Sequence, residues 1–112
     1  MTNETDGPVD VVRARAFELV DTNGRVRARL GMDEDGSMGL DLFDGGGTLR
    51  ASFGVEGAGN TGLDVYATDG TLRASLGVEA SGATGLDLYT DDGTLKASLG
   101  IGAGGETGLD IV

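Results

Sequence analysis

The sequence predicts an all-β fold, an antiparallel meander of about nine short strands built from 23-residue hairpin repeats. Three observations support this prediction: a repeated unit, two glycine-containing turn signals in each unit, and alternation of apolar with polar residues between the turns. The four copies and a partial fifth occupy 17–39, 40–62, 63–85, 86–108 and 109–112. We therefore expect one β-hairpin repeat domain at 12–112, preceded by a flexible acidic tail at 1–11.

The first turn signal of each unit is a pair of turn-forming residues that ends in glycine. Such pairs tolerate a positive φ at both central positions, which is typical of a two-residue type I′ hairpin turn. A two-residue turn at 69–70 pairs residues whose numbers sum to 139, which places Leu63 opposite Leu76. The same register places Tyr66 opposite Arg73. The four pairs are Asn23-Gly24, Gly46-Gly47, Asp69-Gly70 and Asp92-Gly93.

The second turn signal is a glycine that ends a three-residue loop. With a loop at 80–82, Leu76 pairs with Leu86 and the apolar residues on both sides share one face. A glycine at the last loop position is typical of a type I turn followed by a G1 bulge. The four glycines at this position are Gly36, Gly59, Gly82 and Gly105. A parallel β-solenoid of the same period is an alternative, although it does not account for two hairpin turns in each unit.

One face of the expected sheet is apolar in every unit. Nine strands about 4.8 Å apart and roughly 20 Å long present on the order of 900 Å² of apolar surface. Monomers rarely expose more than a few hundred Å² in one apolar patch, so we expect other chains to cover this face. The residues of this predicted assembly face are Leu40, Leu42, Leu49, Phe53, Leu63, Val65, Leu72, Leu76, Leu86, Leu88, Leu95 and Leu99.

We expect a homo-oligomer, and three copies suit these dimensions best. Three flat sheets about 20 Å wide enclose a triangular β-prism whose centre lies about 6 Å from each wall, a distance that leucine side chains fill. A dimeric sandwich, a closed β-barrel and the solenoid are the alternatives. Residues 1–16 are too few and too polar to form a second layer, although Val9, Val11 and Val12 could add an edge strand.

The opposite face is polar and carries the candidate binding residues. We expect cross-strand pairs of Phe43 with Arg50, Tyr66 with Arg73, and Tyr89 with Lys96. Such cation–π pairs stabilise an exposed sheet by about 0.5–1 kcal/mol, and binding of a glycan or a protein is the functional alternative. An aspartate column on the same face, expected to be convex and solvated, is better explained as a solubilising surface than as a hydrolase site. Its members are Asp41, Asp64, Asp87 and Asp110.

Glycines also form an expected column on the polar face. The register places Gly31 opposite Gly39, and the three later units repeat this pair. Glycine inside a strand often marks a bend or a close backbone approach. We favour a prism corner or the packing of a neighbouring chain over a ligand groove.

Composition excludes several classes of function. The chain has 19 acidic and 8 basic residues and a net charge of −11, which disfavours nucleic-acid and membrane partners. It contains neither cysteine nor histidine, so we expect no catalytic site, no metal and no cofactor. No apolar run approaches the length of a membrane span, and residues 1–16 lack the pattern of a signal peptide. We expect a cytoplasmic location by default, with virion or surface assembly as the alternative.

The first repeat unit also resembles a known kind of repeat. Phe17-Glu18-Leu19-Val20-Asp21-Thr22-Asn23-Gly24-Arg25-Val26-Arg27-Ala28-Arg29-Leu30-Gly31 is similar to uncharacterised bacterial β-hairpin repeat proteins with Leu-x-Leu-x-Asp-x-x-Gly-x-x-Arg-Ala-x-Leu-Gly units. The resemblance covers about 12–112 and implies hairpin repeats, without implying an activity or a site.

Together these features predict a non-enzymatic structural or interaction module that self-assembles through its apolar face. The first alternative is a fibre-like or spike-like adhesin that binds a glycan or a protein through its outer face or loop tips. The second is a hydrolase that uses the aspartate column.

Overall fold

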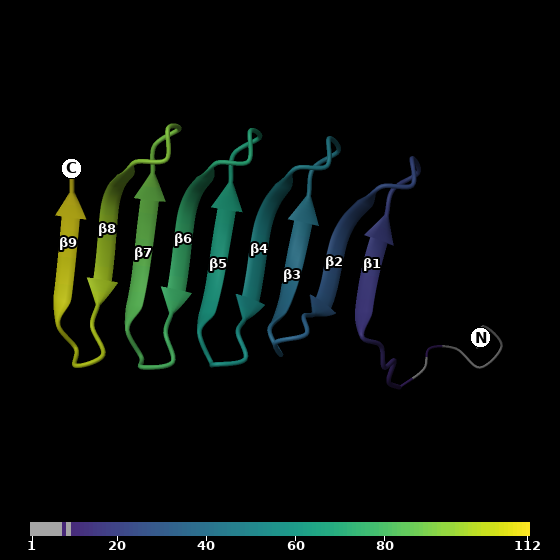
Figure 1. Ribbon diagram of the computed structural model, residues 1–112, viewed down its shortest axis with the longest axis horizontal. Helices are drawn as coiled ribbons and strands as arrows, with labels where there is room; N and C mark the ends of the chain where they lie inside the picture. The colour runs from purple at the N-terminus through teal and green to yellow at the C-terminus, as the bar shows by residue number, and fades with distance from the viewer. Residues whose placement is uncertain (1–7, 9) are drawn as a thin grey trace.

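The structure, a computed structural model, describes residues 8 and 10–112 and forms a single nine-stranded antiparallel sheet (Figure 1). The strands lie in the order in which they occur in the chain, and no helix occurs among the described residues. The predicted all-β meander is therefore confirmed for this part of the chain. The strands are β1 (Ala16–Val20), β2 (Val26–Met32), β3 (Met38–Phe43), β4 (Leu49–Val55), β5 (Thr61–Tyr66), β6 (Leu72–Val78), β7 (Thr84–Tyr89), β8 (Leu95–Ile101) and β9 (Thr107–Ile111).

The sheet is open, with β1 and β9 at its two edges. The closed-barrel alternative is therefore wrong, and the parallel solenoid is wrong because every strand pair is antiparallel. Val11 and Val12 lie outside the strands and are exposed, so they do not add an edge strand. Val9 and most of the predicted tail lie outside the described residues.

The predicted register is confirmed across the sheet. Leu63 lies opposite Leu76, and Leu76 lies opposite Leu86 on its other side. The predicted glycine pairs also form, beginning with Gly31 opposite Gly39. A shift of one residue would move every apolar side chain to the other face, so the alternating pattern specifies the pairing strongly.

The first connection of each unit is not the predicted type I′ turn. Between β5 and β6 the Gly70 N–H donates to the Ala67 carbonyl oxygen at 3.0 Å, and the Ala67 N–H donates to the Thr71 oxygen at 2.9 Å. Gly70 has a φ of +87°, whereas no described non-glycine residue has a positive φ. This is a three-residue type I turn with a G1 bulge, as in the second connection. A type I′ turn would also need a positive φ at Asp69, which costs a non-glycine residue about 1–2 kcal/mol.

A second bulge after this turn restores the predicted register. Tyr66 lies opposite Leu72, whereas Val65 lies opposite Ala74, so Arg73 is the extra residue. The prediction that Tyr66 lies opposite Arg73 is therefore wrong. The other three hairpins of this kind have the same irregularity, and a basic residue is the extra one each time. These residues are Arg27, Arg50 and Lys96.

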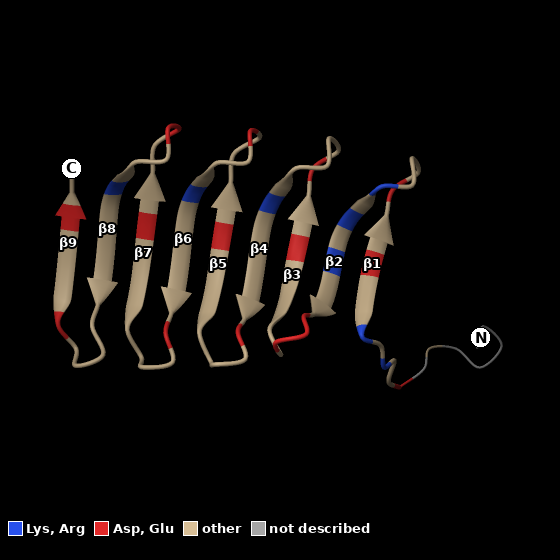
Figure 2. Cartoon of the chain, viewed as in Figure 1, with Lys and Arg blue, Asp and Glu red and all other residues tan. Residues whose placement is uncertain are grey.

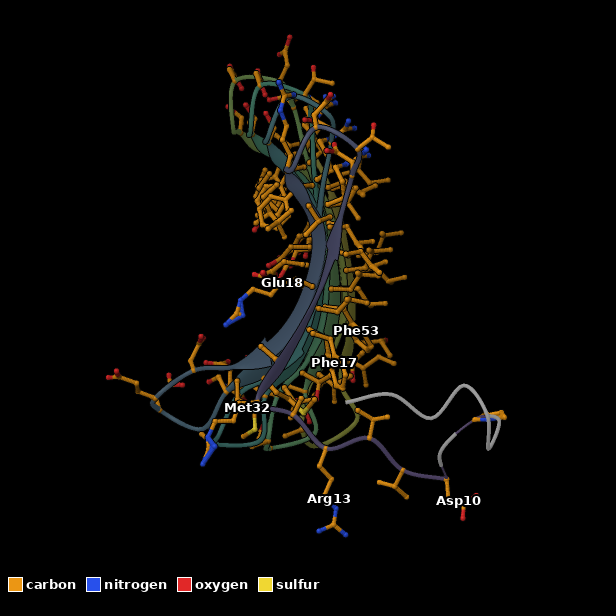
Figure 3. All side chains as sticks on the ribbon, turned by 90° about the vertical axis from the view of Figure 1, so that its right-hand side faces the viewer. Asp10, Arg13, Phe17, Glu18, Met32 and Phe53 are labelled. Atoms are coloured by element: carbon orange, nitrogen blue, oxygen red, sulfur yellow. The ribbon has the colours of Figure 1, made fainter. Side chains whose placement is uncertain are left out.

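The sheet is strongly curved along its strands. Figure 3, which looks along the sheet, shows Phe17 and Phe53 on the convex side and Glu18 on the concave side. The apolar face is therefore the convex one, and the polar face is concave. The expectation of a convex polar face is wrong, in keeping with the bulges, which bend a strand and increase its local twist.

The isolated chain has no core. No described residue is buried, because a single layer leaves both faces open. The chain exposes 8052 Å², whereas a compact monomer of 11.3 kDa exposes about 5,700 Å².

Candidate functional site: the convex apolar face and the concave groove

A continuous row of large apolar side chains runs along the middle of the convex face, one from each strand. We call this row the leucine ridge. Neighbouring members lie directly opposite one another, and their exposed fractions run from 36% at Leu40 to 65% at Leu109. The members are Phe17, Leu30, Leu40, Phe53, Leu63, Leu76, Leu86, Leu99 and Leu109.

Smaller side chains border the ridge on the side of the first turns. Alanine alternates there with a larger aliphatic residue from strand to strand. For example, Val65 lies opposite Ala51 on one side and Ala74 on the other. The border is therefore lower at every second strand, and beside Ala51 a hollow of about 220 Å³ lies between Leu42, Phe53 and Leu63. Together the ridge and this border contain nine of the twelve predicted face residues: Leu40, Leu42, Phe53, Leu63, Val65, Leu76, Leu86, Leu88 and Leu99.

The structure places the other three predicted face residues on the concave face. Residues directly opposite each other in a sheet share a face. The bulges set Leu49 opposite Phe43, Leu72 opposite Tyr66 and Leu95 opposite Tyr89. The prediction for these three leucines is wrong because simple alternation does not allow for the extra residue of each bulge.

The three aromatic residues of these pairs form a row on the polar face, as predicted, but their cross-strand partners are leucines and not the predicted basic residues. Phe43, Tyr66 and Tyr89 are all half-buried. Burial raises the pKa of the Tyr66 phenol, and the carboxylates of Asp64 and Asp41 raise it further. The aromatic row therefore lies beside the aspartate column.

Three of the four basic bulge residues, all arginines, connect their hairpin to the next one. The Nε–H of Arg50 donates to the Tyr66 carbonyl oxygen at 2.7 Å, and that of Arg73 donates to the Tyr89 oxygen at 2.9 Å. Arg27 makes the same bond to Phe43 at 2.8 Å. Each guanidinium thus binds the backbone of the following hairpin, whereas Arg50 and Arg73 were expected to contact the aromatic ring of their own hairpin.

Aspartate and serine alternate along the middle of the concave face. Figure 2 shows the acidic residues as red bands on β3, β5, β7 and β9, and the basic residues as blue bands nearer the first turns on β4, β6 and β8. The Ser52 hydroxyl donates to Asp41 at 2.8 Å, and the Ser98 hydroxyl donates to Asp87 at 2.7 Å. Among the described residues, no three acidic side chains lie close enough to hold a metal ion.

A groove runs along the concave face over the glycine column, across the strands. We call this feature the concave groove. Three hollows of about 590, 360 and 350 Å³ follow one another along it, and adjacent hollows share lining residues. The paired glycines form its floor, and the aspartate–serine row forms one wall. The opposite wall carries acidic residues of the second connections, including Glu56, Glu79 and Glu106.

The charge of the concave groove is strongly one-sided. Among the residues that the structure describes, Arg29 is the only basic one that lines the groove, and its Nε lies 3.9 Å from a Glu18 carboxylate oxygen. Eight carboxylates line the three hollows: Asp33, Asp41, Glu56, Asp64, Glu79, Asp87, Glu106 and Asp110.

Comparison with protein-family models and with curated proteins finds no match for this chain. The part of the chain that the structure describes contains no helix long and apolar enough to cross a membrane. Function is therefore inferred from the geometry of the two faces.

Proposed function

We propose that this protein is a non-enzymatic structural module that assembles with copies of itself, in threes, through its convex apolar face. The leucine ridge supports this proposal most directly. Large apolar side chains normally lie in a core, yet every ridge residue is at least 36% exposed in the isolated chain. A partner must cover the ridge before the sheet has an interior.

The area of the face is sufficient for a stable assembly. About 900 Å² of apolar surface on each chain corresponds to roughly 20 kcal/mol of hydrophobic stabilisation at about 25 cal/mol per Å². The cost of association reduces this gain, but a typical domain is stable by only about 5–15 kcal/mol in total. Three such faces bury about 2,700 Å² in total, which exceeds the roughly 1,600 Å² of a standard specific interface.

The convex shape supports three copies over two. Two convex faces meet only along their ridges, so the flanks of both sheets would stay exposed. Around a threefold axis, each ridge points to the axis and each flank faces the flank of a neighbouring chain. The low alanine positions beside the ridge, such as Ala74, provide room for large side chains from a neighbour.

The distribution of charge supports a second copy of the chain as the partner. The chain carries a net charge of −11, which would oppose close approach of two copies. However, the aspartate column lies on the concave face, away from the ridge, since Asp64 and Asp87 pair with serines one residue along from the ridge leucines. The ridge consists only of leucine and phenylalanine, so self-association through it buries no charged ridge side chain.

The mass in solution tests this proposal. We expect light scattering after size-exclusion chromatography to give about 34 kDa, three times the chain mass of 11.3 kDa. Circular dichroism of the same sample should show a β-sheet spectrum. A folded species of 11.3 kDa would refute self-assembly, and a mass of about 23 kDa would replace the trimer with a dimer.

A further inference from the structure

Most of the paired glycines of the concave groove are not required by the fold of the chain itself. Gly54 is an exception, because a Cβ there would lie 2.9 Å from the Met38 carbonyl oxygen. None of the paired strand glycines has a positive φ, so a side chain would not strain the backbone. A Cβ built at Gly62 or Gly85 meets its nearest atom at 3.7 or 3.9 Å, which is ordinary van der Waals contact. At Gly108 it meets nothing within 4 Å.

The absence of side chains at these positions nevertheless has an energetic cost. Glycine inside a strand destabilises it by roughly 0.5–1 kcal/mol relative to alanine. Because the strands have room for a Cβ at most of these sites, the glycine floor is explained by something outside the chain that approaches the backbone closely. The leucine ridge lies on the opposite face, so the groove stays open when the convex faces are covered.

Charge decides what kind of molecule fits. The eight carboxylates and single guanidinium of the groove disfavour another copy of this acidic chain, because like charges would meet. A cationic ligand complements both walls. Since the groove crosses the strands, its ligand is elongated and lies perpendicular to them.

The spacing of the carboxylates indicates which conformation of a cationic ligand fits the groove. The acidic residues of one wall lie on alternate strands, so they recur about every 9.6 Å. A polyproline II helix has three residues per turn and rises about 3.1 Å per residue, so every third side chain points the same way about 9.3 Å further on. The two periods differ by about 0.3 Å. Lysine side chains are flexible enough to reach their carboxylates despite the small offset that this difference produces over four repeats.

We propose that the concave groove binds an extended cationic peptide in the polyproline II conformation, with a lysine or arginine at every third residue. The peptide backbone lies on the glycine floor, and its cations face the wall formed by Asp41, Asp64, Asp87 and Asp110. A polyproline II backbone makes no internal hydrogen bonds and is already extended, so little ordering is needed on binding.

Fluorescence anisotropy with synthetic peptides tests this site. The probe is a labelled twelve-residue peptide with four Pro-Pro-Lys repeats. Its matched control has the same composition with the four lysines adjacent at one end. We expect the repeating peptide to bind about tenfold more tightly, because each exposed ion pair contributes about 0.2–1 kcal/mol and the control aligns fewer pairs.

Two groups of variants locate the site. Gly62→Ala with Gly85→Ala should weaken binding of the repeating peptide at least about tenfold, because the two methyl groups raise the floor. Asp64→Asn with Asp87→Asn should weaken it about twofold to fivefold per residue. Gly45→Ala is the control, since its Cβ meets nothing within 4 Å and the residue lies in a turn outside the groove. Circular dichroism and solution mass should match those of the unmodified protein in every case.

Three results would overturn the proposal. Equal affinity for the two peptides would indicate attraction to net charge without a site. Unchanged binding by the double-alanine variant would place the peptide elsewhere. Binding of a neutral oligosaccharide that the same alanine variant abolishes, without binding of the repeating peptide, would assign the groove to a glycan.

Discussion

A lysine at the centre of the leucine ridge should separate the chains of the proposed trimer. Leu76 lies between Leu63 and Leu86 in the middle of the sheet, and 45% of it is exposed in the isolated chain. Leu76→Lys introduces no clash within the chain, because this side chain points away from the sheet on its open side. Its effect therefore measures contacts that only a second chain can provide.

The association free energy that Leu76→Lys removes follows from the exposed fraction of Leu76. Burying a whole leucine contributes about 1.5–3 kcal/mol, so covering the remaining 45% contributes about 0.7–1.4 kcal/mol in each chain. Three chains lose about 2–4 kcal/mol in this way. Each ammonium group buried near a threefold axis costs several kcal/mol more. The total exceeds about 10 kcal/mol, which lowers the association constant by about seven orders of magnitude.

Sedimentation velocity and circular dichroism on the same samples provide the assay. At micromolar concentration Leu76→Lys should sediment as a single chain, and its β-sheet spectrum should be lost because a lone sheet has no core. Ser75→Lys is the matched control. It adds the same charge one residue away on the concave face, opposite Asp64 and Asp87, where an ammonium group is favourable.

Assembly through the ridge is refuted if Leu76→Lys keeps both the mass and the spectrum of the unmodified protein. It is also refuted if Ser75→Lys dissociates the assembly to the same extent. In the second case the concave face would be the interface, and the convex ridge would need another partner.

Single substitutions in the turns, the bulges and the glycine column should change the stability of the protein. Gly70→Ala should lower the free energy of unfolding by about 1–2 kcal/mol, because φ at this residue is +87°. Gly62→Ala should raise it by about 0.4–1 kcal/mol, because φ at Gly62 is not positive and alanine restricts the unfolded chain. Thermal unfolding of the two variants compares these effects. The hydroxyl and the backbone N–H of Thr71 both donate to Asp69 and lower the pKa of its carboxyl group from 3.8. The ionised carboxylate therefore stabilises the folded state above pH 3.8. This stability is lost as the pH falls through the lower pKa of the folded state. Asp69→Asn should therefore make the denaturant midpoint less sensitive to acid below pH 4, and equal sensitivity would contradict this. Arg50→Met should cost about 1 kcal/mol in urea unfolding through loss of the bond to the Tyr66 oxygen, and no change would show that the bond contributes nothing.

The strand order and register could be predicted because two independent signals agree. The glycines of the turns recur at fixed positions, and the apolar residues on each side share one face only in one pairing. Leu63 opposite Leu76 satisfies both conditions, and the structure confirms it. The predicted loop at 80–82 is also confirmed, since Gly82 has a φ of +96° and its N–H donates to the Glu79 oxygen.

The same signals could not distinguish a two-residue turn from a three-residue turn followed by a bulge. A two-residue turn and a three-residue turn followed by one extra residue give the same pairing further along the hairpin. The difference appears only locally, where Leu72 takes the position opposite Tyr66. One signal pointed to the bulge: each extra residue is basic, and a long cationic side chain such as that of Arg73 can reach the neighbouring hairpin.

The candidate surfaces were predicted only in part. Alternation identified the apolar face, but it gave no direction of curvature, because bending arises from bulges and strand twist. The aliphatic partners of the aromatic row were missed for the same reason, since Phe43 pairs with Leu49 only through a bulge. The glycine column was predicted, whereas the hollows above it depend on the concave shape.

The spacing of the strands also sets a scale of length for the molecule. Each 23-residue unit contributes two strands, so each adds about 9.6 Å along the sheet without altering its cross-section. Duplication of one unit would lengthen the array by that step and add two ridge residues, so the array would gain length and stability together. The number of repeat units therefore sets the length of the sheet, while its width along the strands stays constant.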